Sequence, residues 1–90
     1  MRLRDTTARR AKLLAGKTEE LLFDDEIPGL ALRLRASGAR SYVFQYRLGQ
    51  KQRRMTIGSA TASDMKNVRK IAKDLYHRVQ LGDDPAFEKH

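Results

Sequence analysis

Three short runs in the middle of the chain alternate apolar and polar residues with a period of two. They occupy residues 29–35, 41–48 and 52–58, and a glycine lies in each gap between them. Period-two alternation is typical of a strand with one buried face, and short gaps that contain glycine are typical of hairpins. The pattern therefore predicts a three-stranded antiparallel meander with turns at Gly38 and Gly49.

The alternation also assigns each side chain of the predicted sheet to one of two faces. One face is apolar enough to form a core and carries Leu30, Leu32, Leu34, Tyr42, Phe44, Tyr46, Leu48, Met55 and Ile57. The other face is mostly basic or polar and carries Ala31, Arg33, Arg35, Val43, Gln45, Arg47, Arg54 and Thr56. No acidic residue occurs between Gly29 and Gly58, so the second face is expected to be positive.

A longer apolar stripe follows the predicted sheet. Its apolar residues are spaced by three and four positions, at Met65, Val68, Ala72, Leu75 and Val79, with Ile71 widening the stripe. This spacing predicts an amphipathic helix that Ser63 or Asp64 caps and that ends at Gly82. We expect the helix to pack on the apolar face of the sheet and to leave the basic face open. The expected fold class is α+β.

The first 28 residues give weaker signals. Residues 1–17 predict either a short helix over residues 8–15, capped by Thr6 or Thr7, or a disordered basic arm. The apolar residues 21–23 can add a short edge strand to the sheet, and the acidic residues 24–26 form a turn. The expected organisation is thus a basic arm in 1–17, a domain in 18–82 and the start of a linker in 83–90.

Positive charge is concentrated in two segments. The chain carries a net charge of +8, with +5 in residues 1–17, −5 in residues 18–28 and +7 in residues 29–58. A charge of this size favours an anionic partner such as DNA, RNA or acidic lipid. Acidic lipid fits least well, because no stretch joins a basic face to a strongly apolar one.

Several classes of function find no support in the composition. The absence of cysteine excludes disulfides and thiolate metal sites. No apolar run approaches the length of a membrane span and no signal peptide is apparent, so a cytoplasmic protein without a membrane partner is expected. The acidic residues 24–26 lack the spacing and the glycine of a calcium loop. They are expected to orient nearby basic side chains or to be solvated.

The chain also lacks a recognisable catalytic set. Its only histidines are His77, on the predicted helix, and His90 at the end. The glycines recur at strand ends and do not cluster before a helix, as a phosphate-binding loop requires. We therefore expect no active site, no cofactor and no small-molecule substrate.

The basic sheet face suits the chemistry of the DNA major groove, which admits β-structure and pairs arginine with guanine and glutamine with adenine. The residues expected to face the groove are Arg33, Arg35, Gln45, Arg47, Arg54 and Thr56. Those expected to contact phosphates are Lys51 and Arg53 at the tip of the second turn, Arg40, and the N-terminal Arg2, Arg4, Arg9 and Arg10. The alternative is a solvated face, because charges on the outer side of a sheet are ordinary.

The order of the motifs is informative beyond the single motifs. The chain reads Phe23-Asp-Asp, Gly29-Leu-Ala-Leu-Arg-Leu, Ser37-Gly-Ala-Arg-Ser-Tyr-Val-Phe-Gln-Tyr-Arg-Leu-Gly, Met55-Thr-Ile-Gly-Ser, and then Val68-Arg69 near the start of a helix. This order resembles the N-terminal domain of phage-type tyrosine recombinases, the integrases of prophages and genomic islands. The resemblance covers residues 5–82. It departs at Glu26-Ile-Pro-Gly, at Tyr42 and at Ala60-Thr61, which alter turns and packing more than chemistry.

The resemblance implies a three-stranded sheet with a C-terminal helix that binds arm-type DNA sites, with the sheet in the major groove. It implies double-stranded DNA as the partner, with other integrase protomers on that DNA as a further candidate. The catalytic Arg, His and Tyr of the family belong to a C-terminal domain that lies outside this chain, so no strand cleavage is expected. The order of elements also resembles double-stranded-RNA domains, although those concentrate basic residues on helix and loops. A protein-interaction module with a basic surface is the third alternative.

Overall fold

The computed structural model describes residues 2–5, 7, 11–13 and 16–88. Four strands form one antiparallel sheet in the order β1-β2-β3-β4. The strands are β1 (Glu19–Phe23), β2 (Leu30–Arg35), β3 (Arg40–Leu48) and β4 (Lys51–Ser59). Two helices follow, α2 (Met65–Gln80) and α3 (Pro85–Glu88). The α+β class and the meander are confirmed.

The number of strands is corrected from three to four. The sequence offered residues 21–23 as an optional edge strand, and the observed strand β1 starts two residues earlier. It pairs along its whole length with β2, from Glu19 opposite Arg35 to Phe23 opposite Ala31. Backbone hydrogen bonding to β2 recruits the two glutamates into the strand although their side chains give no period-two apolar signal. Side chains of β1 therefore join both faces of the sheet.

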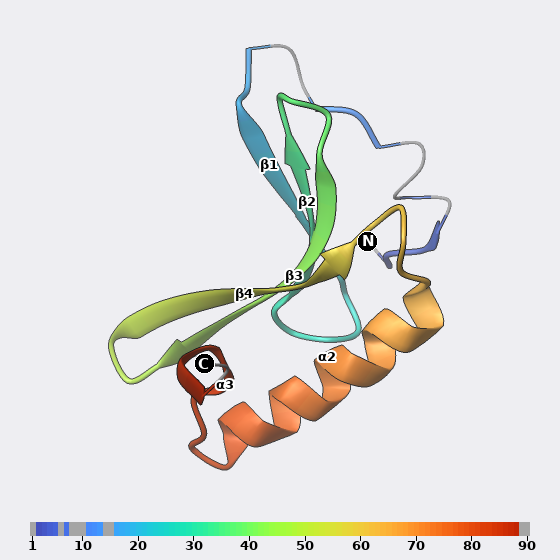
Figure 1. Cartoon of the computed structure of the whole chain (residues 1–90). Helices are drawn as coiled ribbons and strands as arrows, with labels where there is room; N and C mark the ends of the chain where they lie inside the picture. The colour runs from blue at the N-terminus through green and yellow to red at the C-terminus, as the bar shows by residue number, and fades with distance from the viewer. Residues whose placement is uncertain (1, 6, 8–10, 14–15, 89–90) are drawn as a thin grey trace.

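The turns follow the predicted glycines. Gly38 has a φ of +92° and Gly49 a φ of +62°, a region that non-glycine residues rarely adopt. Only Gly49 and Gln50 separate β3 from β4, so Lys51 and Arg53 both belong to the strand. A register shift at Tyr42/Val43 leaves Ile57 without a direct partner, which marks a β-bulge in β4. The sheet is strongly twisted and coiled (Figure 1).

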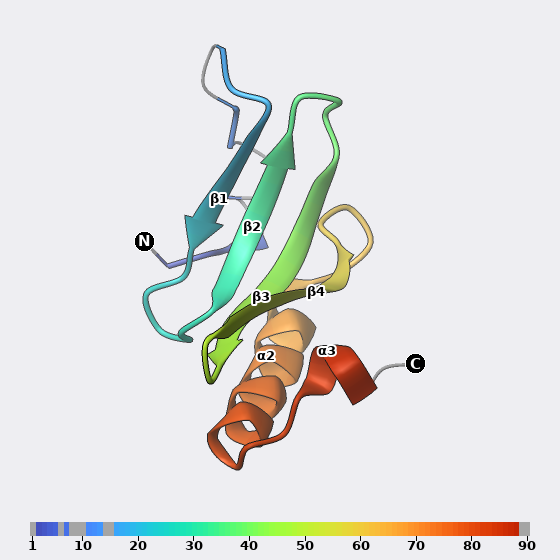
Figure 2. The same cartoon turned by 90° about the vertical axis from the view of Figure 1, so that its left-hand side faces the viewer.

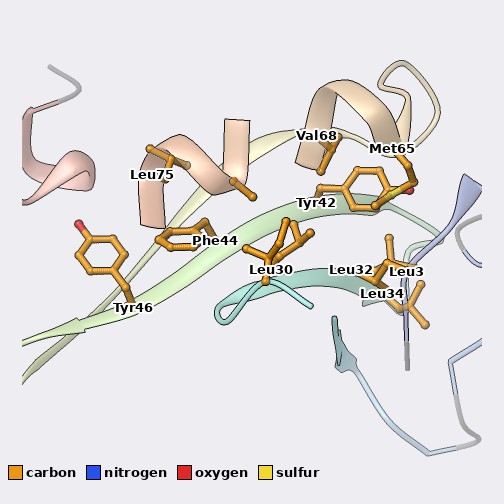
Figure 3. Close-up of a cluster of buried hydrophobic side chains, with 12 residues drawn as sticks. Leu3, Leu30, Leu32, Leu34, Tyr42, Phe44, Tyr46, Met65, Val68 and Leu75 are labelled. Atoms are coloured by element: carbon orange, nitrogen blue, oxygen red, sulfur yellow. The ribbon is translucent and has the colours of Figure 1, made fainter. Parts of the chain in front are cut away.

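The predicted stripe of α2 packs on the apolar sheet face (Figure 3). The buried cluster joins Met65, Val68, Ala72 and Leu75 of the helix to Leu30, Leu32, Leu34, Tyr42, Phe44 and Tyr46 of the sheet. Asp64 caps the helix by accepting a hydrogen bond from the amide of Asn67 at 2.8 Å. The helix ends at Gln80 with Leu81 as its C-cap, and the expected stop Gly82 follows directly with a φ of +93°.

The N-terminal segment contributes to this core in a way that the charge pattern did not indicate. Leu3 is 1% exposed and packs with the residues of β2 and α2. The expected helix over residues 8–15 lies mostly outside the described residues. Residues that the sequence assigned to a basic arm thus include one of the core side chains.

Candidate nucleic-acid interface

One face of the sheet is covered by no helix of the described part of the chain. In Figure 2 the strands lie in front of α2, and this view looks onto that open face. The strand register places in adjacent rows the residues expected to face DNA, because directly opposed residues of antiparallel strands point to the same side. The face carries Arg33, Arg35, Gln45, Arg47, Arg54 and Thr56, as the alternation predicts.

The cations of this open face differ in how strongly the protein holds them. Arg35 and Arg47 are exposed, and no hydrogen bond or ion pair joins their side chains to another described residue. Arg54 instead donates to the side-chain oxygen of Gln45 from both Nε, at 3.3 Å, and Nη2, at 3.2 Å. The open face therefore offers two cations ready for an external anion, while Arg33 and Arg54 are already engaged within the protein.

A row of apolar and small side chains crosses the centre of the open face. The register aligns Phe23, Ala31, Val43 and Thr56 across the four strands. Ala31 and Val43 are both 0% exposed, although they lie on the face opposite the one that α2 covers. Phe23 is 43% exposed at the edge of the row. Its position follows from the pairing of β1, which the alternation signal alone does not contain.

The open face is less uniformly positive than the sequence predicts. Residues 29–58 contain no acid, but the edge strand β1 places Glu19 opposite Arg35. Oε1 of Glu19 accepts a hydrogen bond from Nε of Arg33, and Oε2 lies 3.8 Å from Nη1 of Arg54. The coiling of the sheet lets Arg54 of β4 approach a carboxylate on β1. The basic segment 29–58 therefore lies beside an acidic side chain that the edge strand β1 supplies.

Arg53 and Lys51 lie on the opposite side of the sheet from the groove-facing candidates, because the register places them opposite Tyr46 and Leu48. Nε of Arg53 is 2.7 Å from Oδ2 of Asp84. The Tyr46 hydroxyl donates to Oδ1 of Asp84 and accepts from the amide of Ala86 at 2.9 Å. Burial raises the pKa of Tyr46, and the hydrogen bond to Asp84 raises it further. Arg53 thus ties β4 to the segment before α3 rather than extending from a turn tip.

The acidic turn after β1 organises basic groups, one of the two roles expected for it. Asp24 is buried and accepts hydrogen bonds from Nη1 and Nη2 of Arg69, at 3.0 and 2.7 Å. It also accepts from the amides of Leu3, Glu26 and Ile27 at 2.8 to 2.9 Å. Arg69 donates in turn to the carbonyl oxygen of Leu3 at 2.7 Å. Two residues from separate motifs of the resemblance therefore form one buried ion pair.

The charge state of this ion pair follows from its partners. Burial by itself would raise the pKa of Asp24, but the hydrogen bonds from Arg69 and from the three amides outweigh it and hold that pKa well below its usual range. The hydrogen bond to Asp24 likewise raises the pKa of Arg69. Both groups stay ionised at neutral pH, and they join the N-terminal segment, the β1–β2 turn and α2.

The structure describes some, but not all, of the remaining residues that were expected to contact phosphates. Arg2 forms an ion pair with Glu26 beside the Asp24–Arg69 pair, and Arg4 is exposed. Arg40 begins β3 at the far end of the sheet from the β3–β4 turn. Arg9 and Arg10 lie outside the described residues. The open face and the N-terminal arginines therefore do not form one continuous row in the described part of the chain.

The described part of the chain offers neither a group of metal ligands nor a helix that could span a membrane. No three His, Cys, Asp or Glu side chains there are grouped so that they could hold a metal ion. No helix among the described residues is long and apolar enough to cross a membrane. The oxygens of Asp24, the best buried acid, are already occupied by Arg69 and by backbone amides.

Comparisons with known proteins agree with this geometry. The family model described as the Arm DNA-binding domain matches residues 3–90. The prophage integrase IntF of Escherichia coli (strain K12) is 36% identical over 81 residues, which cover 90% of this chain and 17% of that protein. This chain therefore spans less than a fifth of the length of that relative. The resemblance derived from the motifs is confirmed, and the chain belongs to the arm DNA-binding domain family of integrases.

Proposed function

We propose that this chain binds double-stranded DNA in a sequence-specific way, with the open face of its sheet in the major groove. The DNA would be an arm-type site, and binding would support site-specific integration by a larger integrase. Five side chains that can read base edges share this face: Arg33, Arg35, Gln45, Arg47 and Arg54. The observation that carries the proposal is that α2 covers only the opposite face.

The candidate DNA contacts divide into two roles. Arg35 and Arg47 are exposed cations within the open face, where a strand laid in the groove brings side chains to base edges. Lys51 lies beside the two-residue β3–β4 turn on the helix-facing side of β4, where it would meet a phosphate at the edge of the groove. Phosphate contacts would set the register of the protein on DNA, and the arginines within the sheet would supply sequence discrimination.

A titration of the chain with duplex DNA and duplex RNA at two salt concentrations tests this proposal. With about five phosphates neutralised, the slope of log K against log salt should be about −4.5 on DNA. Salt-sensitive binding that prefers DNA, followed by selection of a preferred sequence from a random pool, is the expected result. A clear preference for RNA would favour an RNA-binding module, and no binding to either at low salt would favour a protein partner. Either outcome would overturn the proposal.

A further inference from the structure

One carboxylate lies among the arginines of the open face, and it engages two of them. Oε1 of Glu19 accepts from Nε of Arg33, while Oε2 lies 3.8 Å from Nη1 of Arg54. The three side chains are only 25% to 34% exposed. Partly buried charges are screened by salt much less than exposed ones, so these contacts persist at ionic strengths that weaken surface pairs.

The contacts leave the two arginines in different states. Arg33 uses Nε for Glu19, and no hydrogen bond or ion pair joins its Nη groups to another described residue. A guanidinium held in this way keeps a fork of two donors for a bidentate contact with guanine. Arg54 is bound more completely, because Gln45 takes Nε and Nη2 while Glu19 lies near Nη1.

We infer that Glu19 is a specificity-determining residue of the DNA-binding face. It positions Arg33 for a base contact, and it withholds Arg33 and Arg54 from contacts with phosphates of any sequence. This inference rests on the proposed function. Glu19 acts through the two arginines and does not itself contact DNA.

Two physical effects support this role. A side chain already held by an ion pair loses less conformational freedom when it meets a base, so the base contact is made at lower entropic cost. A carboxylate on the binding face also repels phosphates, which lowers affinity for every duplex. A base contact that depends on the position of Arg33 compensates for this repulsion only at the correct sequence. Glu19 would therefore lower non-specific binding more than specific binding.

The test replaces Glu19 by its neutral isostere, Glu19→Gln, in the whole 90-residue chain. The matched control is Glu20→Gln, which makes the same change in net charge on the helix-facing side of β1, opposite Leu34. Affinity is measured for a random-sequence duplex and for the duplex that the wild-type chain selects from a random pool. Circular dichroism on both variants checks that the fold is kept.

Removing one repelling charge is expected to make the slope of log K against log salt on random duplex steeper by about 0.9. With equal affinity at 1 M salt, this slope corresponds to about eightfold tighter binding of the variant at 0.1 M salt. The ratio of selected to random affinity should fall about fivefold or more, the equivalent of weakening one bidentate base contact. Glu20→Gln should leave that ratio unchanged. In an Arg33→Ala background, Glu19→Gln should change the ratio much less, because the two residues act as a unit.

The inference is overturned if the ratio is unchanged in Glu19→Gln, if Glu20→Gln has the same effect, or if the effects of Glu19→Gln and Arg33→Ala simply add. These outcomes differ from failure of the proposed function, which would appear as wild-type protein that does not bind duplex DNA. If the wild-type chain binds duplex DNA and the two glutamine variants behave alike, only the role of Glu19 is contradicted.

Discussion

The two faces of the sheet are built from the same alternation, but they are held in place by different forces. The helix-facing side buries Leu30, Tyr42 and Phe44 to 1% exposure or less against α2. The open side carries Arg35 and Arg47, which are exposed and pair with no other described residue. Packing fixes the first face, whereas no contact within the described part of the chain fixes these two arginines. Stability and binding should therefore respond to different substitutions in the same strands.

The largest difference between the faces should appear on truncation within β3. Phe44→Ala is expected to lower the free energy of unfolding by about 3–5 kcal/mol, because a buried ring is replaced by a cavity. Arg47→Ala, three positions along the strand, should change it by less than about 0.5 kcal/mol. Urea unfolding followed by circular dichroism measures both.

Because a small domain has only about 5–15 kcal/mol of stability, Phe44→Ala alone can leave too little folded protein to measure. Phe44→Leu, expected to cost about 1–1.5 kcal/mol, keeps the test usable. Similar losses in the Phe44 and Arg47 variants would contradict the division of the sheet into a packing face and a binding face.

The buried pair between Asp24 and Arg69 should give the next largest effect. Asp24→Asn leaves Arg69 without its counter-ion and is expected to cost about 3–5 kcal/mol at pH 7. The pKa of Asp24 is lowered by folding, so its charged form stabilises the protein above the unfolded pKa of about 3.9. That contribution is lost as the pH falls below this value toward the lower pKa of the folded state.

The difference between wild type and Asp24→Asn should therefore shrink between pH 7 and pH 3, which urea unfolding at both pH values measures. Asp74→Asn is the control, since Asp74 is exposed on α2 and pairs only with the neighbouring Arg78 at 3.2 Å. It should change stability by less than about 0.5 kcal/mol. An Asp24→Asn penalty that is equal at both pH values would argue against an ionised Asp24 in the fold.

A smaller effect is expected where the turn before β2 touches β3. Gly29 has a φ of +93°, and a Cβ there would lie 2.3 Å from the carbonyl oxygen of Gln45. Gly29→Ala should cost about 3 kcal/mol, from the left-handed conformation and from the displaced strand. Gly38→Ala has a similar φ of +92° but open space around it, and should cost only about 1–2 kcal/mol. Equal losses in thermal or urea unfolding would show that close approach of the backbones is unimportant.

The smallest change in free energy is expected for the open face, and it should appear in binding. Arg47→Ala should lose about 1–3 kcal/mol on the selected duplex and relax preference at one base position. Lys70→Ala removes the same charge from the exposed side of α2 and is the control, which should leave sequence preference unchanged. Competition with duplexes that carry single base changes measures the preference. Unchanged preference in Arg47→Ala would show that the open face does not read this base.

The local features of the fold were readable from neighbouring residues. The period-two runs identified β2, β3 and β4 and the faces of their side chains, and the three-four spacing identified α2 with its cap at Asp64. Glycines marked both hairpins. These signals are local because backbone geometry relates each residue to those two, three or four positions away. The edge strand β1 was the strand that the sequence predicted least well, because Glu19 and Glu20 interrupt the apolar pattern.

Local patterns in the sequence predict that one sheet face is apolar and the other basic, and that a helix can cover only the first. Which charges meet depends on the three-dimensional fold. It brought Glu19 to Arg33 across 14 positions, Asp24 to Arg69 across 45 and Leu3 to Arg69 across 66. It also brought Asp84 to Arg53, on the side of β4 that the alternation assigns to Met55 and Ile57. Such pairs depend on register and on the coiling of the sheet, and no local period encodes either.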